Sequence, residues 1–179
     1  MFANALLRTW VFPVLIVPRV VVGTVPTDCV TIKSHATGSY LELDDSFDDL
    51  RTHVTLGGAL DLWNVLPDGD GEGGWFRIQH LEPYQDLYAA SEQYEYSEDL
   101  RQVFTWANGA TVRQGHWDIT ELDGEKVGNG PKRFLIRNTY YNEYLCAAHE
   151  RVFTWRTHAD IEDSSFMWTI QSCDQETFP

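Results

Sequence analysis

One pattern of apolar residues recurs three times along the chain, and this repeat restricts the fold more than any other sequence feature. In each copy an isoleucine is followed nine residues later by a leucine, and the pairs are Ile32 and Leu41, Ile78 and Leu87, and Ile136 and Leu145. Each copy ends with a tryptophan two residues before a β-branched residue: Trp63-x-Val65, Trp117-x-Ile119 and Trp168-x-Ile170. Such self-similarity indicates one supersecondary unit used three times around a shared core.

The runs inside each copy alternate apolar and polar residues, which is typical of half-buried strands, and segments rich in Gly, Asp, Asn or Pro separate them. A further run in each copy is aligned as Val54-Thr55-Leu56, Phe104-Thr105-Trp106 and Phe153-Thr154-Trp155. Twelve short strands in three units favour a closed barrel with a hairpin cap, because closure removes exposed sheet edges. We therefore predict an all-β fold, a β-trefoil with repeats at about 29–66, 75–122 and 133–173. A β-sandwich is the competing fold.

The tryptophans divide into two groups. The three that close the repeats are expected in the core, because aromatic side chains dominate core packing. Trp106 and Trp155 recur in only two units, so they are candidate ligand-binding residues. The Gln-x-Trp triplet of ricin-type lectins is absent, since Gln114 and Trp117 are separated by two residues.

The N-terminus has the pattern of a secretory signal peptide. Arg8 precedes an apolar run from Trp10 to Val17, and small residues follow at Val22 and Gly23. We expect residues 1–23 to be a signal peptide and residues 24–179 to form one secreted, extracellular domain. The run is too short and too interrupted for a membrane span, so no membrane insertion is expected.

Charge restricts the class of partner. The 179 residues include 27 acidic and 13 basic side chains, a formal net charge of −14. This charge repels phosphate backbones and anionic lipids, so nucleic acid is not expected as a ligand. An extracellular protein with a basic surface, or a glycan, remains compatible with it.

Three cysteines are present, and a secreted chain offers them an oxidising environment. Cys29 opens the first strand-like run and Cys173 closes the last, so we predict a disulfide between them. Cys146 remains either a free thiol or the site of an intermolecular bridge.

The run FLIRNTYYNEYLCAA at 134–148, followed by RVFTW at 151–155, carries a family resemblance. It resembles the repeat of small secreted insect β-trefoil proteins. These include the trefoil half of haemolymph low-molecular-mass lipoproteins and the Trp-rich salivary proteins of blood-feeding insects. The resemblance covers residues 30–173 and implies secretion and binding, with no catalytic residues. The helical half of the lipoproteins is missing, which argues against lipid carriage.

Motifs for catalysis are missing from the sequence. It contains no Gly-x-Ser-x-Gly, His-Glu-x-x-His or Cys-x-x-Cys pattern, so no enzyme activity and no cofactor are expected. Asp68, Asp70 and Glu72 alternate with glycines like the start of a calcium loop, but Gln79 stands where a bidentate Glu is needed. This loop is a weak metal candidate beside the alternative of an acidic turn. The acidic run at Asp44, Asp45, Asp48 and Asp49 is interpreted as a solvated face.

A segment that mixes tyrosines and carboxylates is the main candidate for a binding epitope. Its residues are Tyr94, Glu95, Tyr96, Glu98 and Asp99. Tyrosine suits interfaces, and the carboxylates would steer a basic partner toward it. The tyrosines could equally fold back onto the barrel. The sequence thus predicts a secreted, non-enzymatic binding protein that engages an extracellular protein, with a lectin-like protein as the alternative.

Overall fold

The computed structural model describes residues 25–68, 74–94, 97–122, 131–148, 151–155 and 163–175. For residues 93, 94 and 97–99 it describes the backbone alone. The expected signal peptide, residues 1–23, lies outside the described residues. Within them, no helix is long and apolar enough to cross a membrane.

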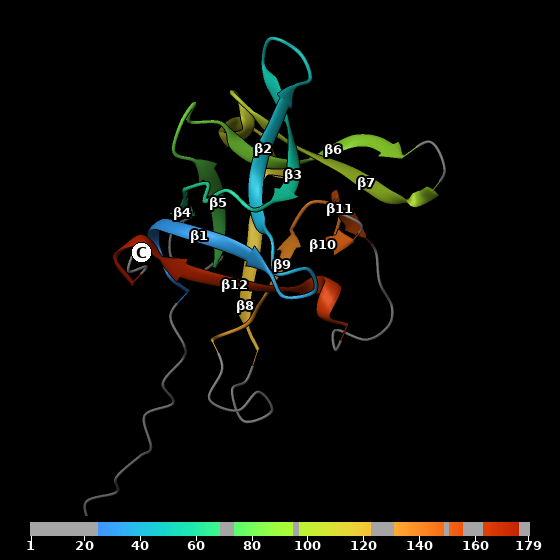
Figure 1. The fold of residues 1–179 in the computed structure, drawn as a ribbon. Helices are drawn as coiled ribbons and strands as arrows, with labels where there is room; N and C mark the ends of the chain where they lie inside the picture. Colours follow the sequence, from blue (N-terminus) through green and yellow to red (C-terminus); the bar gives the residue numbers. More distant parts are fainter. Residues whose placement is uncertain are drawn as a thin grey trace, which may run out of the picture.

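The described residues form strands, four in each repeat, joined by turns and short 3-10 helices (Figure 1). The first repeat contains β1 (Asp28–Ser34), β2 (Tyr40–Ser46), β3 (Arg51–Gly57) and β4 (Trp63–Asp68). The second contains β5 (Trp75–His80), β6 (Asp86–Tyr94), β7 (Ser97–Trp106), η1 (Gly109–Thr111), η2 (Arg113–Gly115) and β8 (Trp117–Glu121). The third contains β9 (Phe134–Asn138), β10 (Glu143–Ala148), β11 (Arg151–Trp155), η4 (Ser164–Phe166), β12 (Met167–Ser172) and η5 (Cys173–Gln175).

Two sets of pairings define the architecture. The first and fourth strands of the units close into a ring, in the order β1, β4, β5, β8, β9, β12 and back to β1. The second and third strands form three hairpins, and β3, β7 and β11 pair with one another to join these hairpins into a cap. A six-stranded barrel closed by a hairpin triplet is a β-trefoil, so the predicted fold class is confirmed. The sandwich alternative is wrong, because the strands close into one ring.

The repeated apolar positions fill the core as predicted. The isoleucines, leucines and tryptophans of the repeat are 0% exposed, and they are Ile32, Ile78, Ile136, Leu41, Leu87, Leu145, Trp63, Trp117 and Trp168. Each buried indole N–H donates to the carbonyl oxygen of the repeat leucine in its own unit, at 2.9, 2.9 and 3.0 Å. A buried indole needs such an acceptor. Each of these three bonds joins a barrel strand to a cap strand, so the cap is attached to the barrel once in every unit.

The alignment of the third strands was wrong by one residue. In the cap, Leu41 lies opposite Leu56, whereas Leu87 lies opposite Thr105 and Leu145 lies opposite Thr154. The residues that follow these partners are therefore equivalent: Gly57, Trp106 and Trp155. A slip of one residue exchanges the two faces of a strand, so local composition cannot fix the register.

At this position the first unit has a glycine, Gly57, whereas the second and third units have tryptophans, Trp106 and Trp155. A Cβ at Gly57 would overlap the carboxylate of Glu42, which occupies that space. Burial raises the pKa of Glu42, and the nearby Asp61 carboxylate raises it further. The tryptophan position is thus available for binding only in the second and third units.

The turn after the first strand of each unit contains one residue with a left-handed φ angle. These residues are Gly38 (73°), Tyr84 (64°) and Asn142 (57°). Glycine and asparagine adopt this conformation readily, but it is unfavourable for a bulky side chain. Tyr84 therefore carries local backbone strain, and its side chain is 65% exposed.

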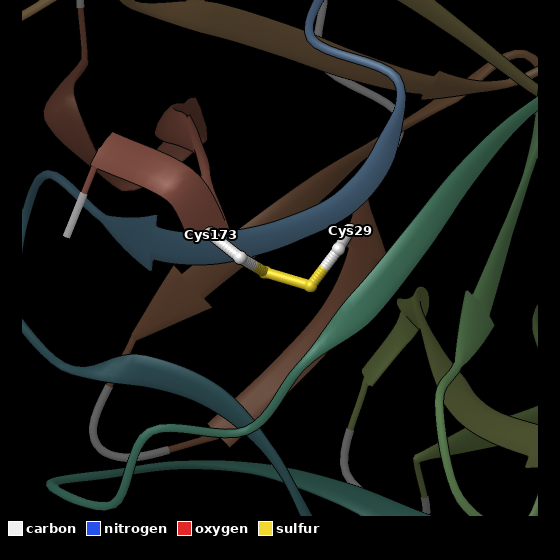
Figure 2. Close-up of a disulfide and its surroundings, with 2 residues drawn as sticks. All are labelled: Cys29 and Cys173. Atoms are coloured by element: carbon white, nitrogen blue, oxygen red, sulfur yellow. A yellow bond between two sulfur atoms is a disulfide. The ribbon is translucent and has the colours of Figure 1, made fainter.

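The disulfide predicted from the sequence is present. Cys29 at the start of β1 is bonded to Cys173 after β12, with 5.6 Å between their Cα atoms (Figure 2). Because β1 and β12 are paired in the barrel, the bridge ties together two ends that already lie side by side. Cys146 is a free, buried thiol with 1% exposure, and burial raises its pKa to about 11. A thiol in this position is shielded from partners while the chain is folded.

A buried ion pair links the second and third units in the cap. The guanidinium of Arg101 on β7 donates to both carboxylate oxygens of Glu143 on β10, at 3.0 and 3.2 Å. Thr154 donates to the same carboxylate at 2.7 Å, and the guanidinium carbon lies 3.6 Å from the centroid of the Tyr141 ring. The remaining Arg101 Nη1 donates to two backbone carbonyls of β6. Every polar atom of the pair is therefore satisfied, as a buried charge requires.

Candidate functional site

The tyrosine-rich segment lies in the β6–β7 hairpin. Glu95 and Tyr96 are outside the described residues, and the side chains of Tyr94, Glu98 and Asp99 are not described. Tyr94 ends β6, and Glu98 and Asp99 lie near the start of β7. The role of this segment stays a prediction.

The weak calcium candidate is described only at its first residue. Asp68 forms an ion pair with Arg77 at 3.1 Å, while Asp70 and Glu72 lie outside the described residues. Among the residues that are described, no three His, Cys, Asp or Glu side chains are grouped so that they could hold a metal ion.

Trp106 and Trp155 occupy equivalent positions in different units, so the structure does not bring them into one site. Each ends the third strand of its unit and lies opposite the third strand of the preceding unit. Trp106 pairs with Arg51, and Trp155 pairs with Leu100. Trp155 is 38% exposed and packs against Phe166 with 5.8 Å between ring centroids. Among the residues that the structure describes, Trp106 lines a cleft together with charged side chains.

Trp106 lines a surface cleft of about 610 Å³ between the first and second units, here called the Trp106 cleft. Its other walls are residues 48–51 of the β2–β3 hairpin, Tyr88, Ala89, Ser91 and Glu92 of β6, Val112 between η1 and η2, and Gln114 of η2. The volume lies in the range of small-molecule or side-chain binding sites. The β2–β3 hairpin projects above β6 and β7 (Figure 1).

Arg51 organises the wall of the Trp106 cleft. Its Nε donates to Asp48 Oδ2 at 2.7 Å, and its Nη1 donates to Glu92 Oε1 at 2.9 Å and to the Tyr88 hydroxyl at 3.4 Å. The guanidinium carbon also lies 4.4 Å from the centroid of the Phe47 ring. These contacts fasten the hairpin tip to β6, so the cleft is assembled before any ligand arrives.

Aromatic rings form a continuous layer beneath the cleft. The Tyr88 ring lies 5.5 Å from Trp106 and 6.1 Å from Phe104, and Phe47 lies 4.8 Å from Phe104 between ring centroids. Phe47 and Leu50 at the hairpin tip are 45% and 48% exposed. Large apolar side chains exposed beside a cleft are typical of interaction sites.

Two carboxylates of the cleft, those of Asp48 and Glu92, are ionised at neutral pH. Backbone N–H donors from Leu50, then the Arg51 side chain, lower the pKa of Asp48. Burial tends to raise the pKa of Glu92, but its backbone hydrogen bond and Arg51 outweigh this effect and lower it. Burial raises the pKa of Tyr88, which therefore stays neutral. A general acid needs a raised carboxyl pKa, so these two acids are suited to binding cations rather than to proton transfer.

The cleft has an excess of negative charge. Asp48, Asp49 and Glu92 face it with one cation, Arg51, which gives a net formal charge of −2. Asp48 and Glu92 are held by Arg51, whereas Asp49 forms no ion pair within the part of the chain that the structure describes. Asp44, Asp45, Asp48 and Asp49 are all exposed, as the interpretation of the acidic run as a solvated face predicts. Asp48 is in addition bonded to Arg51, and Asp49 lines the cleft.

Comparisons with known proteins place the fold but not a ligand. The sequence matches no family model and no curated protein. Two solved salivary proteins from Culex quinquefasciatus, of the Cysteine and Tryptophan-Rich (CWRC) family, share the fold. One has a TM-score of 0.68 and 24% identity, over 84% of this chain and 96% of that chain. The other has a TM-score of 0.67 and 21% identity, over 85% and 97%. The resemblance to Trp-rich salivary proteins of a blood-feeding insect is thus confirmed at the level of the fold.

A lectin shares the same fold. The Polyporus squamosus lectin, solved with the influenza-binding epitope Neu5Aca2-6Galb1-4GlcNAc, has a TM-score of 0.62 and 14% identity over 83% of this chain and 50% of that chain. At this identity the similarity concerns architecture alone. Function therefore has to be argued from the residues of the cleft.

Proposed function

We propose that this protein is a secreted, non-enzymatic binding protein that engages an extracellular protein with a basic surface through the Trp106 cleft. Residues 1–23 act as its signal peptide, and residues 24–179 form its single domain. Its disulfide suits an oxidising extracellular environment. The solved neighbours described as salivary proteins support the same location.

The observation that carries the proposal is the combination of aromatic and anionic groups in one preassembled cleft. Trp106 and Tyr88 supply aromatic faces, and the surrounding carboxylates exceed the cations by two charges. Aromatic rings with carboxylates beside them favour Lys and Arg side chains through cation–π contacts and charged hydrogen bonds. The net charge of −14 adds a long-range field that accelerates the approach of a basic partner.

The tyrosine-rich segment extends this surface in the proposal. Glu92 of the cleft belongs to the same β6–β7 hairpin as Tyr94, Glu95, Tyr96, Glu98 and Asp99. In this proposal the acids and tyrosines that follow Glu92 in the sequence form a second contact region for the partner. Removing these side chains should weaken binding less than removing the cleft residues, because rim contacts contribute mainly to the association rate.

A charge-matched pair of variants tests the proposal. Binding of purified extracellular proteins with basic or acidic isoelectric points would be measured by surface plasmon resonance at about 0.05 M and about 0.5 M salt. The cleft variant Asp48→Asn/Asp49→Asn/Glu92→Gln removes three charges. The control variant Asp28→Asn/Glu82→Gln/Asp174→Asn removes three exposed charges elsewhere. We expect salt-sensitive binding of basic proteins that the cleft variant loses and the control retains. Equal losses in both variants, or no binding of basic proteins, would refute the proposal.

A neutral glycan is the second candidate ligand. Trp106 offers a stacking face, and Asp49 and Gln114 in the same cleft can accept and donate hydrogen bonds to hydroxyl groups. The acidic walls disfavour anionic sugars. A glycan array should then show neutral glycans whose signal disappears in Trp106→Ala, while a blank array would exclude this function.

A further inference from the structure

The geometry points to the side chain that the cleft recognises: a single arginine of the partner, with Asp49 as its counter-ion and Trp106 as its stacking face. This inference rests on the proposed function and makes it specific. It concerns one cleft of about 610 Å³ and a chemical group of defined shape and charge.

The cleft offers a separate surface for each part of an arginine side chain. Asp49 is an exposed carboxylate without an internal ion pair among the described residues, so it can accept two parallel N–H bonds. Trp106 provides an aromatic face for the planar guanidinium. Leu50 and Val112 provide apolar walls against which the methylene stem can pack.

The protein already holds one guanidinium in this way. Arg51 lies over the Phe47 ring at 4.4 Å and is bonded to Asp48 and Glu92 at 2.7 and 2.9 Å. These two carboxylates offset the charge of Arg51, so a second guanidinium beside it meets the remaining negative charge of Asp49. The attraction of the carboxylates for the partner's guanidinium therefore outweighs its repulsion by Arg51.

Arginine fits these surfaces better than lysine does. The guanidinium is planar, binds a carboxylate with two hydrogen bonds and is weakly hydrated, whereas an ammonium is a compact and strongly hydrated charge. A neutral side chain of the same shape lacks the charge that Asp49 needs. The cleft should thus rank arginine above lysine and lysine above citrulline.

Three short peptides test this ranking on the full mature chain. Ac-Gly-Arg-Gly-NH2 and its lysine and citrulline analogues would be titrated by calorimetry or by tryptophan fluorescence. We expect the arginine peptide to bind with a dissociation constant of about 1 mM. The lysine peptide should bind several-fold more weakly, and the citrulline peptide at least about tenfold more weakly.

Two variants locate the binding. Asp49→Asn should weaken the arginine peptide about tenfold, whereas Asp45→Asn, which neutralises an acid of the same hairpin outside the cleft lining, should leave it unchanged. Trp106→Leu should weaken it about fivefold. Thermal unfolding of each variant confirms that the fold is intact.

The outcomes separate this inference from the proposed function. The inference is overturned if the citrulline peptide binds as tightly as the arginine peptide. It is also overturned if the Asp49→Asn variant binds the arginine peptide as tightly as the wild type does. If basic proteins bind through the cleft but the arginine peptide does not bind at several millimolar, the inference fails and the proposed function stands. If basic proteins show no cleft-dependent binding, the proposed function fails as well.

Discussion

Replacing either member of the buried pair Arg101 and Glu143 should destabilise the protein strongly, and replacing both should restore part of the loss. The two side chains are 11% and 5% exposed, so water cannot solvate the partner that remains. Glu143 accepts three hydrogen bonds, two from Arg101 and one from Thr154. Breaking a buried pair of this kind typically costs about 3–5 kcal/mol.

The two single variants differ in what they leave behind. In Arg101→Met the carboxylate of Glu143 keeps only the Thr154 hydroxyl, so we expect a loss of about 4–5 kcal/mol. In Glu143→Gln the guanidinium keeps two backbone carbonyls and the Tyr141 ring, so the loss should be nearer about 3 kcal/mol. The double variant Arg101→Met/Glu143→Met replaces charge by apolar volume and should be more stable than Arg101→Met alone.

Urea unfolding followed by tryptophan fluorescence measures these differences, with the m-value checked for constancy. A domain of this size has about 5–15 kcal/mol of stability, so the expected losses are a large fraction of the total. Circular dichroism at zero denaturant shows whether each variant is folded. A loss below about 1 kcal/mol in Arg101→Met, or a double variant that is no more stable than Arg101→Met, would refute the reasoning.

Three further predictions concern the cysteines and the strained turn. Replacing Cys29 and Cys173 by alanine opens a loop closed over a separation of 144 residues, and the chain-entropy estimate gives a loss of up to about 5 kcal/mol in urea unfolding; a loss below about 1 kcal/mol would contradict it. The pKa of Cys146 is raised to about 11 in the folded state, so its neutral thiol stabilises the fold fully below about pH 8.5. As the pH rises through 11, the wild type should lose about 2–3 kcal/mol relative to Cys146→Ala, and equal pH dependence in the two proteins would exclude this. Tyr84→Gly removes the strain of a left-handed φ and should raise stability by about 0.5–1 kcal/mol, whereas Tyr84→Ala keeps the strain and should give no gain in thermal unfolding.

The barrel could be predicted from the sequence because its core positions repeat with fixed spacing. Ile32 and Leu41 recur in every unit at the same separation, and both are fully buried in the structure. The closing Trp63 recurs with its own acceptor, the carbonyl of Leu41. The same apolar positions must be buried in every unit, so the sequence pattern predicts the structure correctly at these core positions.

The register of the third strands could not be predicted in the same way. Thr55 and Thr105 look equivalent in a gapless alignment, yet the first-unit residue equivalent to Thr105 is Leu56, because each lies opposite the repeat leucine of its own unit. Strand composition leaves two registers open, and the cross-strand pairing of the cap decides between them. Gly57 stands in the first unit at the position of Trp106 and Trp155, and no pattern in the sequence marks this equivalence.

The cleft was partly accessible to sequence reasoning. Trp106 was predicted as a binding residue, and it lines the cleft. Arg51 and Asp49 were missed, because the β2–β3 hairpin meets Trp106 only through the long-range pairing of β3 with β7. Tyr88 was missed as well, although its strand β6 pairs with β7 in the neighbouring hairpin. The acidic residues before Arg51 gave a signal, but an acidic run is ordinarily solvated, and only the ring contacts of Arg51 show that the hairpin tip is an ordered wall.

The most direct test of the account follows the indole N–H resonances of the tryptophans during titration with a basic peptide containing arginine and lysine. The resonance of Trp106 should shift in a saturable way, and the shift should diminish at about 0.5 M salt. The resonances of Trp63, Trp117 and Trp168 should stay in place, because these side chains are fully buried. A saturable shift at Trp155 with Trp106 unchanged, or no shift at any indole, would contradict the assignment of binding to the Trp106 cleft.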